Sequence, residues 1–172
     1  MKITNGILER VEKIKVLVMD VDGTLTDGKI YMGENGEIMK AFNIKDGHAI
    51  YRINNFGIVP AVITGRESKI VENRCRELKI KYFYQGVHNK LEKLSELLCE
   101  LGAETGEKLT LENVAYAGDD IIDLECMERC GVAICPADAV DEVIAVSHFV
   151  SSKNGGCGVV REFYDFIKNV RG

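Results

Sequence analysis

Asp20 and Asp22, in the stretch DVDGTLTDG from Asp20 to Gly28, have the types and spacing best suited to chemistry. They directly follow the apolar run VLVM at 16 to 19. Two carboxylates this close together are unfavourable unless a cation or a shared proton offsets their repulsion. With a cation present, one carboxylate can attack phosphorus and form an aspartyl-phosphate. The other can protonate the leaving oxygen and later activate water.

Further polar residues lie where later apolar runs end, or at the start of the helix that follows one of them. They are Thr64, Gly65, Arg66, Lys90, Asp119, Asp120 and Asp123. Ligands of open parallel sheets bind at the carboxyl ends of the strands, so these side chains are expected to converge with Asp20 and Asp22. Clustered carboxylates suit Mg²⁺, and we interpret the opening pair as neutralised by a cation. The order favours Asp20 as nucleophile and Asp22 as acid/base, with Thr64 and Lys90 contacting the phosphoryl oxygens.

The elements that must position these residues alternate between strand and helix. Continuous apolar runs, typical of strands buried on both faces, occupy 15 to 20, 58 to 65, 81 to 86, 113 to 120 and 131 to 136. Helical periodicity occupies 49 to 56, 69 to 78, 90 to 101 and 121 to 130. This alternation predicts an α/β fold with a doubly wound parallel sheet and right-handed crossovers.

Three segments stand outside this alternation. Residues 28 to 43 hold two short strand-like runs around GENG, which predicts a β-hairpin insertion after the first strand. Residues 1 to 14 predict an amphipathic helix packed outside the core. Residues 153 to 172 predict a flexible glycine-rich loop and a closing helix. The whole chain, 1 to 172, is expected to form one domain.

Composition excludes several classes of protein. The 172 residues are 46% hydrophobic and 28% charged, and their net charge of −5 offers no basic stripe for nucleic acid. The apolar runs are too short to span a bilayer and no secretion signal is visible, so we expect a cytoplasmic protein without a membrane partner. The six cysteines form no CxxC pair. Cys126 and Cys130 could be half of a metal site, but packing is the favoured interpretation.

The ordered set DVDGTLTDG, ITGR, NK at 89 to 90 and GDDIID at 118 to 123 resembles the haloacid dehalogenase superfamily of phosphotransferases. Longer stretches are similar to its small sugar-acid phosphatases that lack a cap domain. These stretches are DGKIYMGENGEIMKAFNIKDG, VITGRESKIVENRCREL, YQGVHNK, NVAYAGDDIIDLECM and GGCGVVREF. The similarity extends over about residues 14 to 166.

The resemblance implies a Mg²⁺-dependent phosphatase of a phosphorylated ulosonic acid, active in lipopolysaccharide biosynthesis. The implied metal ligands are Asp20, Asp22 through its main-chain carbonyl, and Asp119. Asp120 and Asp123 are implied to lie next to these ligands and to orient them without contacting the metal. The implied substrate-binding residues are Asp22, Asn43, Lys45, Asp46, Gly47, Thr64, Gly65, Arg66, Arg74 and Lys90. Such relatives form homotetramers in which the hairpin lines a neighbour's site and the glycine-rich tail reaches a site mouth. Cys157 departs from the basic or polar residue expected in that tail.

Alternatives remain open at this point. Arg66 and Arg74 favour 3-deoxy-D-manno-octulosonate 8-phosphate as substrate, and a nine-carbon ulosonate or acylneuraminate 9-phosphate is the alternative. A phosphoacceptor receiver also uses acidic residues, Thr and Lys on a doubly wound sheet, but in a different order along the chain. A catalytically idle oligomerisation module is a further alternative. The presence of every expected catalytic residue argues against it.

Overall fold

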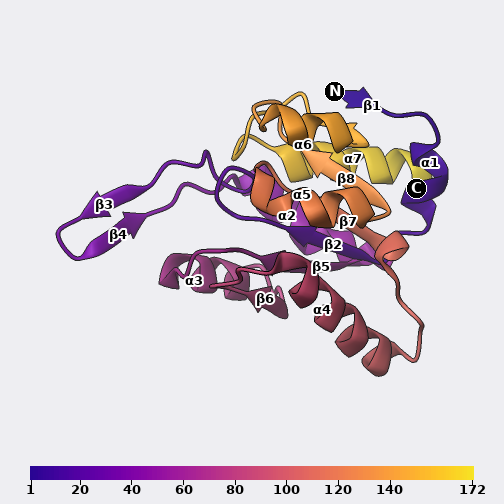
Figure 1. Ribbon diagram of the computed structural model, residues 1–172, viewed down its shortest axis with the longest axis horizontal. Coiled ribbons are helices and arrows are strands. Elements are labelled where there is room, and N and C mark those ends of the chain that lie inside the picture. Colours follow the sequence, from indigo (N-terminus) through magenta and orange to yellow (C-terminus); the bar gives the residue numbers. More distant parts are fainter.

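A seven-stranded sheet forms the centre of the computed structural model, which describes residues 1–172 (Figure 1). Its strand order is β1-β9-β8-β7-β2-β5-β6, and every neighbouring pair is parallel except β1 and β9. The strands are β1 (Lys2–Ile3), β2 (Val16–Met19), β5 (Val59–Ile63), β6 (Tyr82–Tyr84), β7 (Val114–Ala117), β8 (Val132–Cys135) and β9 (Phe149–Val150). The predicted doubly wound parallel sheet is therefore confirmed.

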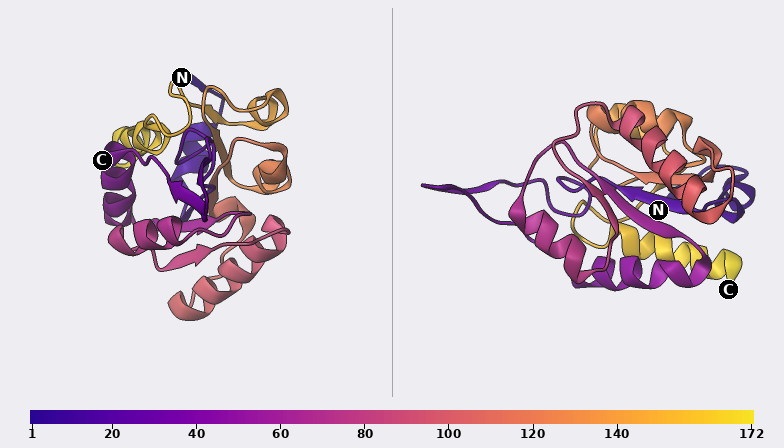
Figure 2. Two further views of the ribbon diagram at one scale, coloured as in Figure 1. Left: turned by 90° about the vertical axis from the view of Figure 1, so that its left-hand side faces the viewer. Right: turned by 90° about the horizontal axis from the view of Figure 1, so that it is seen from below.

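Helices cover both faces of this sheet (Figure 2). One face carries α1 (Ile7–Glu12), α2 (Ile44–Arg52), α3 (Lys69–Glu77) and α7 (Val159–Arg171). The other face carries α4 (Lys90–Thr105), α5 (Ile121–Arg129) and α6 (Asp141–Val146). Short 3-10 turns, η1 (Ile53–Phe56) and η2 (Leu111–Asn113), precede β5 and β7.

Strand β2 is apolar at every position because both of its faces are buried. Leu17 and Met19 belong to the core under α1, α2 and α7, whereas Val16 and Val18 belong to the core under α4 and α5. All four are 0% exposed. Successive side chains of a strand point to opposite faces, so a strand covered on both faces needs apolar residues at every position.

The predicted hairpin is present and projects away from the sheet (Figure 1). It consists of β3 (Tyr31–Gly33) and β4 (Gly36–Met39), which pair antiparallel. The chain turns between Gly33 and Gly36, and Gly36 has φ of 109°, a conformation that favours glycine. No other insertion interrupts the sheet, and no cap domain covers its carboxyl edge.

Two predictions about local structure were wrong. The N-terminal helix does not pack outside the core, since Ile7, Val11 and Ile14 are at most 2% exposed and belong to the core cluster of α2 and α7. Helix α2 begins at Ile44, not near residue 49, because the Asn43 side chain accepts a hydrogen bond from Lys45 N at 2.8 Å and caps the first turn. Strands β1 and β9 and helix α6 were not expected. They are short, and short elements give little periodic signal.

The loop before α7 packs against the loop that follows β2. Gly156 N donates to Thr24 O at 3.0 Å, and a Cβ on Gly155 would lie 1.9 Å from Gly23 O. Glycine is required at 155 because the two backbones approach so closely. The glycine-rich segment thus supports the Asp20–Gly28 loop of its own chain. None of the helices is both long enough and apolar enough to traverse a bilayer.

Candidate active site

Asp20 lies at the carboxyl end of β2, beside the end of β7. Its backbone N–H donates to Ala117 O at 2.9 Å, which continues the β2–β7 ladder by one residue. Asp119 follows two residues after Ala117. The parallel register therefore brings the carboxylates of two distant sequence motifs to one edge of the sheet, as the sequence predicted.

Three carboxylates converge at this edge: oxygen atoms of Asp20, Asp119 and Asp123 all lie within 4.8 Å of one another. The start of α5 fixes this geometry. Asp120 is its N-cap and accepts from Ile121 N at 2.7 Å, while Asp123 Oδ2 accepts from Asp119 N at 3.3 Å. Asp123 thus lies within the cluster, and the exposed Asp120 carboxylate serves the helix terminus.

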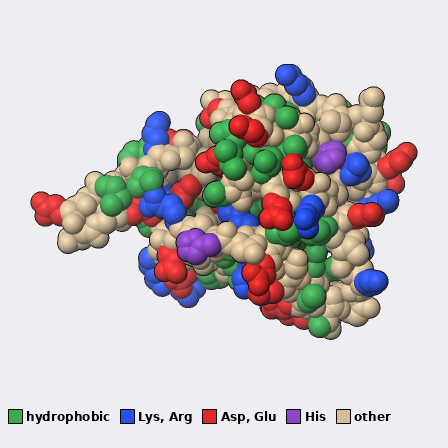
Figure 3. Space-filling model, in the orientation of Figure 1, with side chains coloured by type: hydrophobic (Ala, Val, Ile, Leu, Met, Phe, Trp, Pro, Cys, Tyr) green, Lys and Arg blue, Asp and Glu red, His purple; other side chains and the backbone are tan.

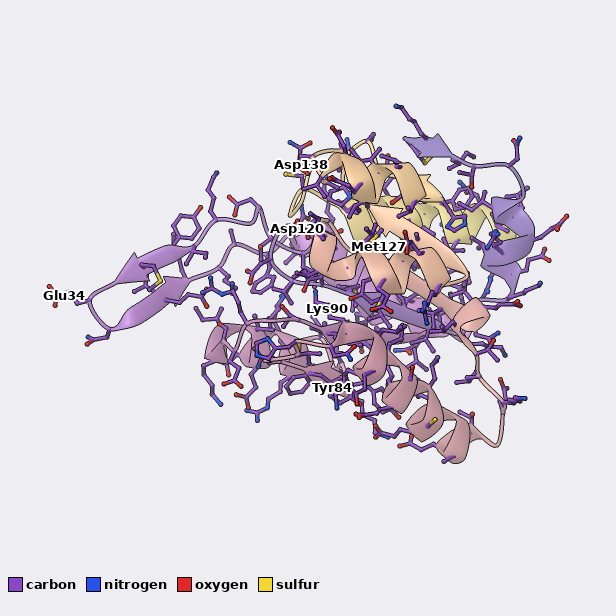
Figure 4. The ribbon with its side chains drawn as sticks, viewed as in Figure 1. Glu34, Tyr84, Lys90, Asp120, Met127 and Asp138 are labelled. Carbon is purple, nitrogen blue, oxygen red and sulfur yellow. The ribbon has the colours of Figure 1, made fainter.

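Lys90, the first residue of α4, supplies the positive charge inside the cluster. Its Nζ lies 3.0 Å from Asp20 Oδ1 and 2.7 Å from Asp123 Oδ1, and Tyr116 OH donates to the same Asp123 oxygen at 3.0 Å. Burial alone would lower the pKa of Lys90, but the carboxylates of Asp20 and Asp123 outweigh it and raise that pKa. Lys90 therefore stays charged. Figure 4 shows Lys90 and Asp120 on the side from which the hairpin projects.

One ammonium does not balance three carboxylates. Burial, with the nearby charge of Asp123, raises the pKa of Asp20 from 3.8 to about 6 despite Lys90. Burial also raises the pKa of Asp119 to about 7, with Asp20 and Asp123 adding to the effect. Asp20 Oδ1 is buried, and the Lys90 ammonium that lies 3.0 Å from it is shared with Asp123. Buried carboxylate oxygens that exceed the available positive charge fit a divalent cation such as Mg²⁺.

A hollow of about 250 Å³ opens above this cluster. Its lining residues are Asp20, Asp22, Gly23, Gly28, Thr64, Gly65, Arg66, Asp119, Asp120 and Ile122. Thr64 is 3% exposed at the end of β5. The hollow thus unites the acidic cluster with the predicted phosphate-binding residues from the neighbouring strand.

Asp22 lies at the rim of the hollow and points toward the base of the hairpin. Its carboxylate contacts Lys40 Nζ, and its Oδ2 lies 3.7 Å from Arg66 Nε. Arg66 NH2 in turn lies 3.4 Å from Glu37 Oε1. The hairpin base is therefore connected to the catalytic loop by side-chain charges.

The remaining predicted substrate-binding residues lie elsewhere. Asn43, Asp46, Gly47 and Arg74 line a separate, largely apolar hollow between α2 and α3. Asp46 Oδ1 accepts from Arg161 N at 2.7 Å, so this carboxylate caps the first turn of α7. Arg74 packs against Gly47, where a Cβ would meet its NH2 atom at 2.3 Å, and pairs with Glu77 at 2.8 Å.

Lys45 lines a surface depression beside Cys157 and Arg161. The structure thus gathers Thr64, Gly65, Arg66 and Lys90 at the acidic cluster, and it does not bring Lys45 or Arg74 into the same hollow. Cys126 and Cys130, weighed as half of a metal site, are both buried in the core.

Sequence reasoning missed several residues that shape the site. Thr24 Oγ1 donates to Asp119 Oδ1 at 2.8 Å, and the Thr24 side chain is completely buried. Its place in DGTLT was a usable signal, because a hydroxyl two residues after an acidic pair can reach a neighbouring carboxylate. Glu37 and Lys40 gave no comparable signal, since they lie in the predicted hairpin and bond Ser68 and Asp22 outside it. Tyr116 gave none because a tyrosine within an apolar run is equally typical of a core position.

Comparison with known proteins agrees with this geometry. No family model matches the chain. The 3-deoxy-D-manno-octulosonate 8-phosphate phosphatase of Salmonella typhi is 44% identical over 172 residues, covering 99% of this chain and 87% of the relative. The structure of a Legionella pneumophila protein described as a haloacid dehalogenase superfamily hydrolase has a TM-score of 0.89 and 33% identity. It covers 97% of this chain and 88% of that one.

A third relative is known with bound ligands. The Moraxella catarrhalis 3-deoxy-D-manno-octulosonate 8-phosphate phosphatase was solved in complex with magnesium, phosphate and KDO. Its structure has a TM-score of 0.90 and 36% identity, covering 98% of this chain and 93% of that one.

An acidic cluster with a buried lysine, on a doubly wound sheet without a cap domain, defines the class of protein: a phosphoric monoester hydrolase of the haloacid dehalogenase superfamily. The resemblance inferred from the sequence is confirmed at this level. Within the superfamily, the chain belongs to the family of 3-deoxy-D-manno-octulosonate 8-phosphate phosphatases.

Proposed function

We propose that this chain is a Mg²⁺-dependent phosphatase that hydrolyses 3-deoxy-D-manno-octulosonate 8-phosphate through an aspartyl-phosphate on Asp20. One observation carries the proposal: the carboxylates of Asp20, Asp119 and Asp123 converge, and Asp20 and Asp119 line a hollow that Thr64 and Arg66 also line. The named activity of relatives at 44% identity, and the magnesium, phosphate and KDO bound by the Moraxella catarrhalis relative, support the substrate and the metal.

The metal would be held by Asp20, Asp119 and the main-chain carbonyl of Asp22. When bound, Mg²⁺ neutralises carboxylate charge and polarises the phosphoryl oxygens. Asp123 and Asp120 hold these ligands in place without contacting the metal. Asp123 accepts hydrogen bonds from the backbone N–H groups of Asp119 and Asp120, and the Asp120 side chain caps α5. Second-sphere contacts of this kind hold ligands in a fixed orientation.

The protein groups divide the chemistry as follows. An Asp20 carboxylate oxygen attacks phosphorus, while the Asp22 carboxyl gives its proton to the leaving sugar oxygen. Lys90 and Thr64 stabilise the negative charge of the phosphoryl oxygens during transfer. Water then attacks the aspartyl-phosphate and gives its proton to Asp22, which regenerates Asp20 and releases phosphate.

The sugar acid is bound by Arg66, whose guanidinium is suited to a carboxylate. Further contacts to the sugar acid are proposed for Asn43, Lys45, Asp46, Gly47 and Arg74. In this chain they line hollows other than the one above Asp20. We propose that the hairpin of a neighbouring copy lines the site, in a homotetramer.

The surface of the hairpin supports such an assembly. Ile30, Met32, Ile38 and Met39 are each at least 49% exposed, and Figure 3 shows apolar atoms on this projecting element. Exposed apolar side chains that cluster on one element are typical of protein interfaces. We further propose that the 172 residues function as one phosphatase domain in the cytoplasm, in lipopolysaccharide biosynthesis.

A panel of phosphorylated sugar acids tests the proposal. Phosphate release should require Mg²⁺, stop on addition of EDTA, and show the highest kcat/KM with the eight-carbon 8-phosphate. A higher kcat/KM with a nine-carbon 9-phosphate would reassign the substrate within the same mechanism. The absence of release from every sugar acid in the panel would contradict the proposed function.

A further inference from the structure

Lys40, directly after β4, carries a charge in a place where charge is costly. Its side chain is 1% exposed, and its Nζ contacts Asp22 Oδ1 and lies 2.9 Å from Glu37 Oε1. Withdrawing an ammonium group from water is unfavourable unless carboxylate partners compensate for the lost hydration. Lys40 is therefore held tightly by these two carboxylates.

The partner Glu37 is itself fixed by groups outside the hairpin. Its Oε2 accepts from Ser68 Oγ at 2.5 Å, and its Oε1 lies 3.4 Å from Arg66 NH2. Ser68 is the N-cap residue of α3, at the end of the loop from β5. Lys40 is thus anchored through Glu37 to Ser68 and Arg66, which lie outside the Asp20–Gly28 loop.

The two oxygens of Asp22 differ as a result. Lys40 occupies Oδ1, whereas Oδ2 has no hydrogen bond and lies 3.7 Å from Arg66 Nε, beyond hydrogen-bond distance. A carboxyl group held through one oxygen presents the other in a defined direction. Asp22 lines the hollow above Asp20, and Lys40 leaves its Oδ2 without a hydrogen bond.

We propose that Lys40 is a positioning residue for proton transfer: it holds Asp22 through Oδ1 so that Oδ2 exchanges the proton with substrate and water. This rests on the proposed function, in which Asp22 is the acid/base. As the bond from Asp20 to phosphorus forms and the ester P–O bond breaks, the Oδ2 proton moves to the leaving oxygen. When water later attacks the aspartyl-phosphate, its proton returns to Oδ2.

The inference makes the effect of Lys40 depend on the leaving group. A sugar alkoxide leaves slowly without a proton, so hydrolysis of a sugar phosphate needs a correctly oriented Asp22. Nitrophenolate is stable near neutral pH and leaves without one. A general structural defect would slow both reactions alike, whereas loss of orientation slows the sugar phosphate selectively.

The test compares kcat/KM for 3-deoxy-D-manno-octulosonate 8-phosphate and p-nitrophenyl phosphate at saturating Mg²⁺, because this ratio reports the steps up to phosphoryl transfer and excludes the later attack of water that both substrates share. Lys40→Met, which keeps the aliphatic stem, should lower kcat/KM for the sugar phosphate by about 10- to 100-fold and for p-nitrophenyl phosphate by less than about 3-fold. Lys40→Arg should restore part of the loss. The matched control is Lys29→Met, since Lys29 is an exposed hairpin lysine paired only with Asp27, and both rates should be unchanged.

Equal slowing of both substrates by Lys40→Met, or no slowing of the sugar phosphate, would overturn the inference. If Lys40→Met lacks a cooperative thermal transition, Glu37→Gln decides, because it removes the anchor of Lys40 and should change the ratio of the two rates in the same direction. If the wild-type protein hydrolyses another alkyl phosphate in place of the ulosonate, the proposed substrate fails. The leaving-group comparison then proceeds with that alkyl phosphate.

Discussion

Lys90 Nζ donates a hydrogen bond to Asp123 Oδ1 at 2.7 Å, which joins the first residue of α4 to the first turn of α5. Both side chains are almost completely buried, at 3% and 0% exposure. The contact links two helices on one face of the sheet directly to the acidic cluster. It keeps Lys90 beside Asp20, where a phosphoryl group would be transferred.

Lys90→Met is expected to impair both catalysis and stability. Without the ammonium, charge on the phosphoryl oxygens loses a stabilising partner, and kcat should fall by about 100-fold or more. Two buried carboxylates also lose their counterion, so the free energy of unfolding in EDTA should fall by about 3 kcal/mol. Urea titration and steady-state assays measure the two effects. The control is Lys93→Met, on the same helix but with a surface ion pair to Glu96. It should leave kcat unchanged and lower the free energy of unfolding by only a few tenths of a kcal/mol.

Asp20→Asn should abolish phosphate release while leaving the fold intact, because an amide has nearly the same shape as a carboxylate but cannot attack phosphorus as one. A fall in kcat of at least about a thousandfold is expected. A thermal transition within a few degrees of wild type would show that the loss is chemical. Asp141→Asn, at an exposed position of α6, is the matched control. Unchanged turnover in Asp20→Asn would reject the aspartyl-phosphate mechanism.

Thr24→Val should weaken metal binding without emptying the core. The substitution keeps the buried volume of Thr24 but removes the hydroxyl that donates to Asp119 Oδ1 at 2.8 Å. Loss of such an outer contact typically costs about tenfold or more in metal affinity. Calorimetric titration with Mg²⁺ measures it. Thr105→Val, which removes a hydroxyl bonded to Leu101 O in α4, should retain wild-type affinity. Equal affinity in Thr24→Val and wild type would contradict a role for this hydroxyl.

The stabilising effect of Mg²⁺ should increase with pH between about 5 and 8. Burial raises the pKa of Asp20 from 3.8 to about 6 and that of Asp119 to about 7. A carboxyl whose pKa is higher in the folded state leaves stability unchanged below its unfolded value of 3.8. It then destabilises the metal-free fold progressively as pH rises toward 7.

Because Mg²⁺ binds the ionised carboxylates, it should offset that loss most at high pH. Thermal unfolding with Mg²⁺ and with EDTA should therefore give a larger difference in Tm at pH 8 than at pH 5. Asp119→Asn should reduce the difference at pH 8. An equal difference at both pH values in the wild type would show that these carboxyl groups do not control binding.

The sequence predicted those parts of the molecule that depend on local pattern. Uninterrupted apolar runs such as VAYA at 114 to 117 identified the buried strands, because a strand covered on both faces must be apolar at successive positions. The ends of those runs identified Asp20, Thr64 and Asp119, because the first polar residue after a buried strand lies at the edge of the sheet. Helix α1 was misjudged because its pattern showed an apolar stripe but not what the stripe would contact.

Only the tertiary structure decided which side chains meet. The chain alone could not reveal that Lys40 contacts Asp22, or that Asp46 caps α7, because each contact joins segments whose relative placement depends on how hairpin and helices pack around the sheet. Residue type and spacing thus determined the kind of chemistry available at the carboxyl edge of the sheet. The hydrogen bonds and ion pairs that orient each group depend on distances of a few ångströms between segments far apart in sequence, and folding alone sets those distances.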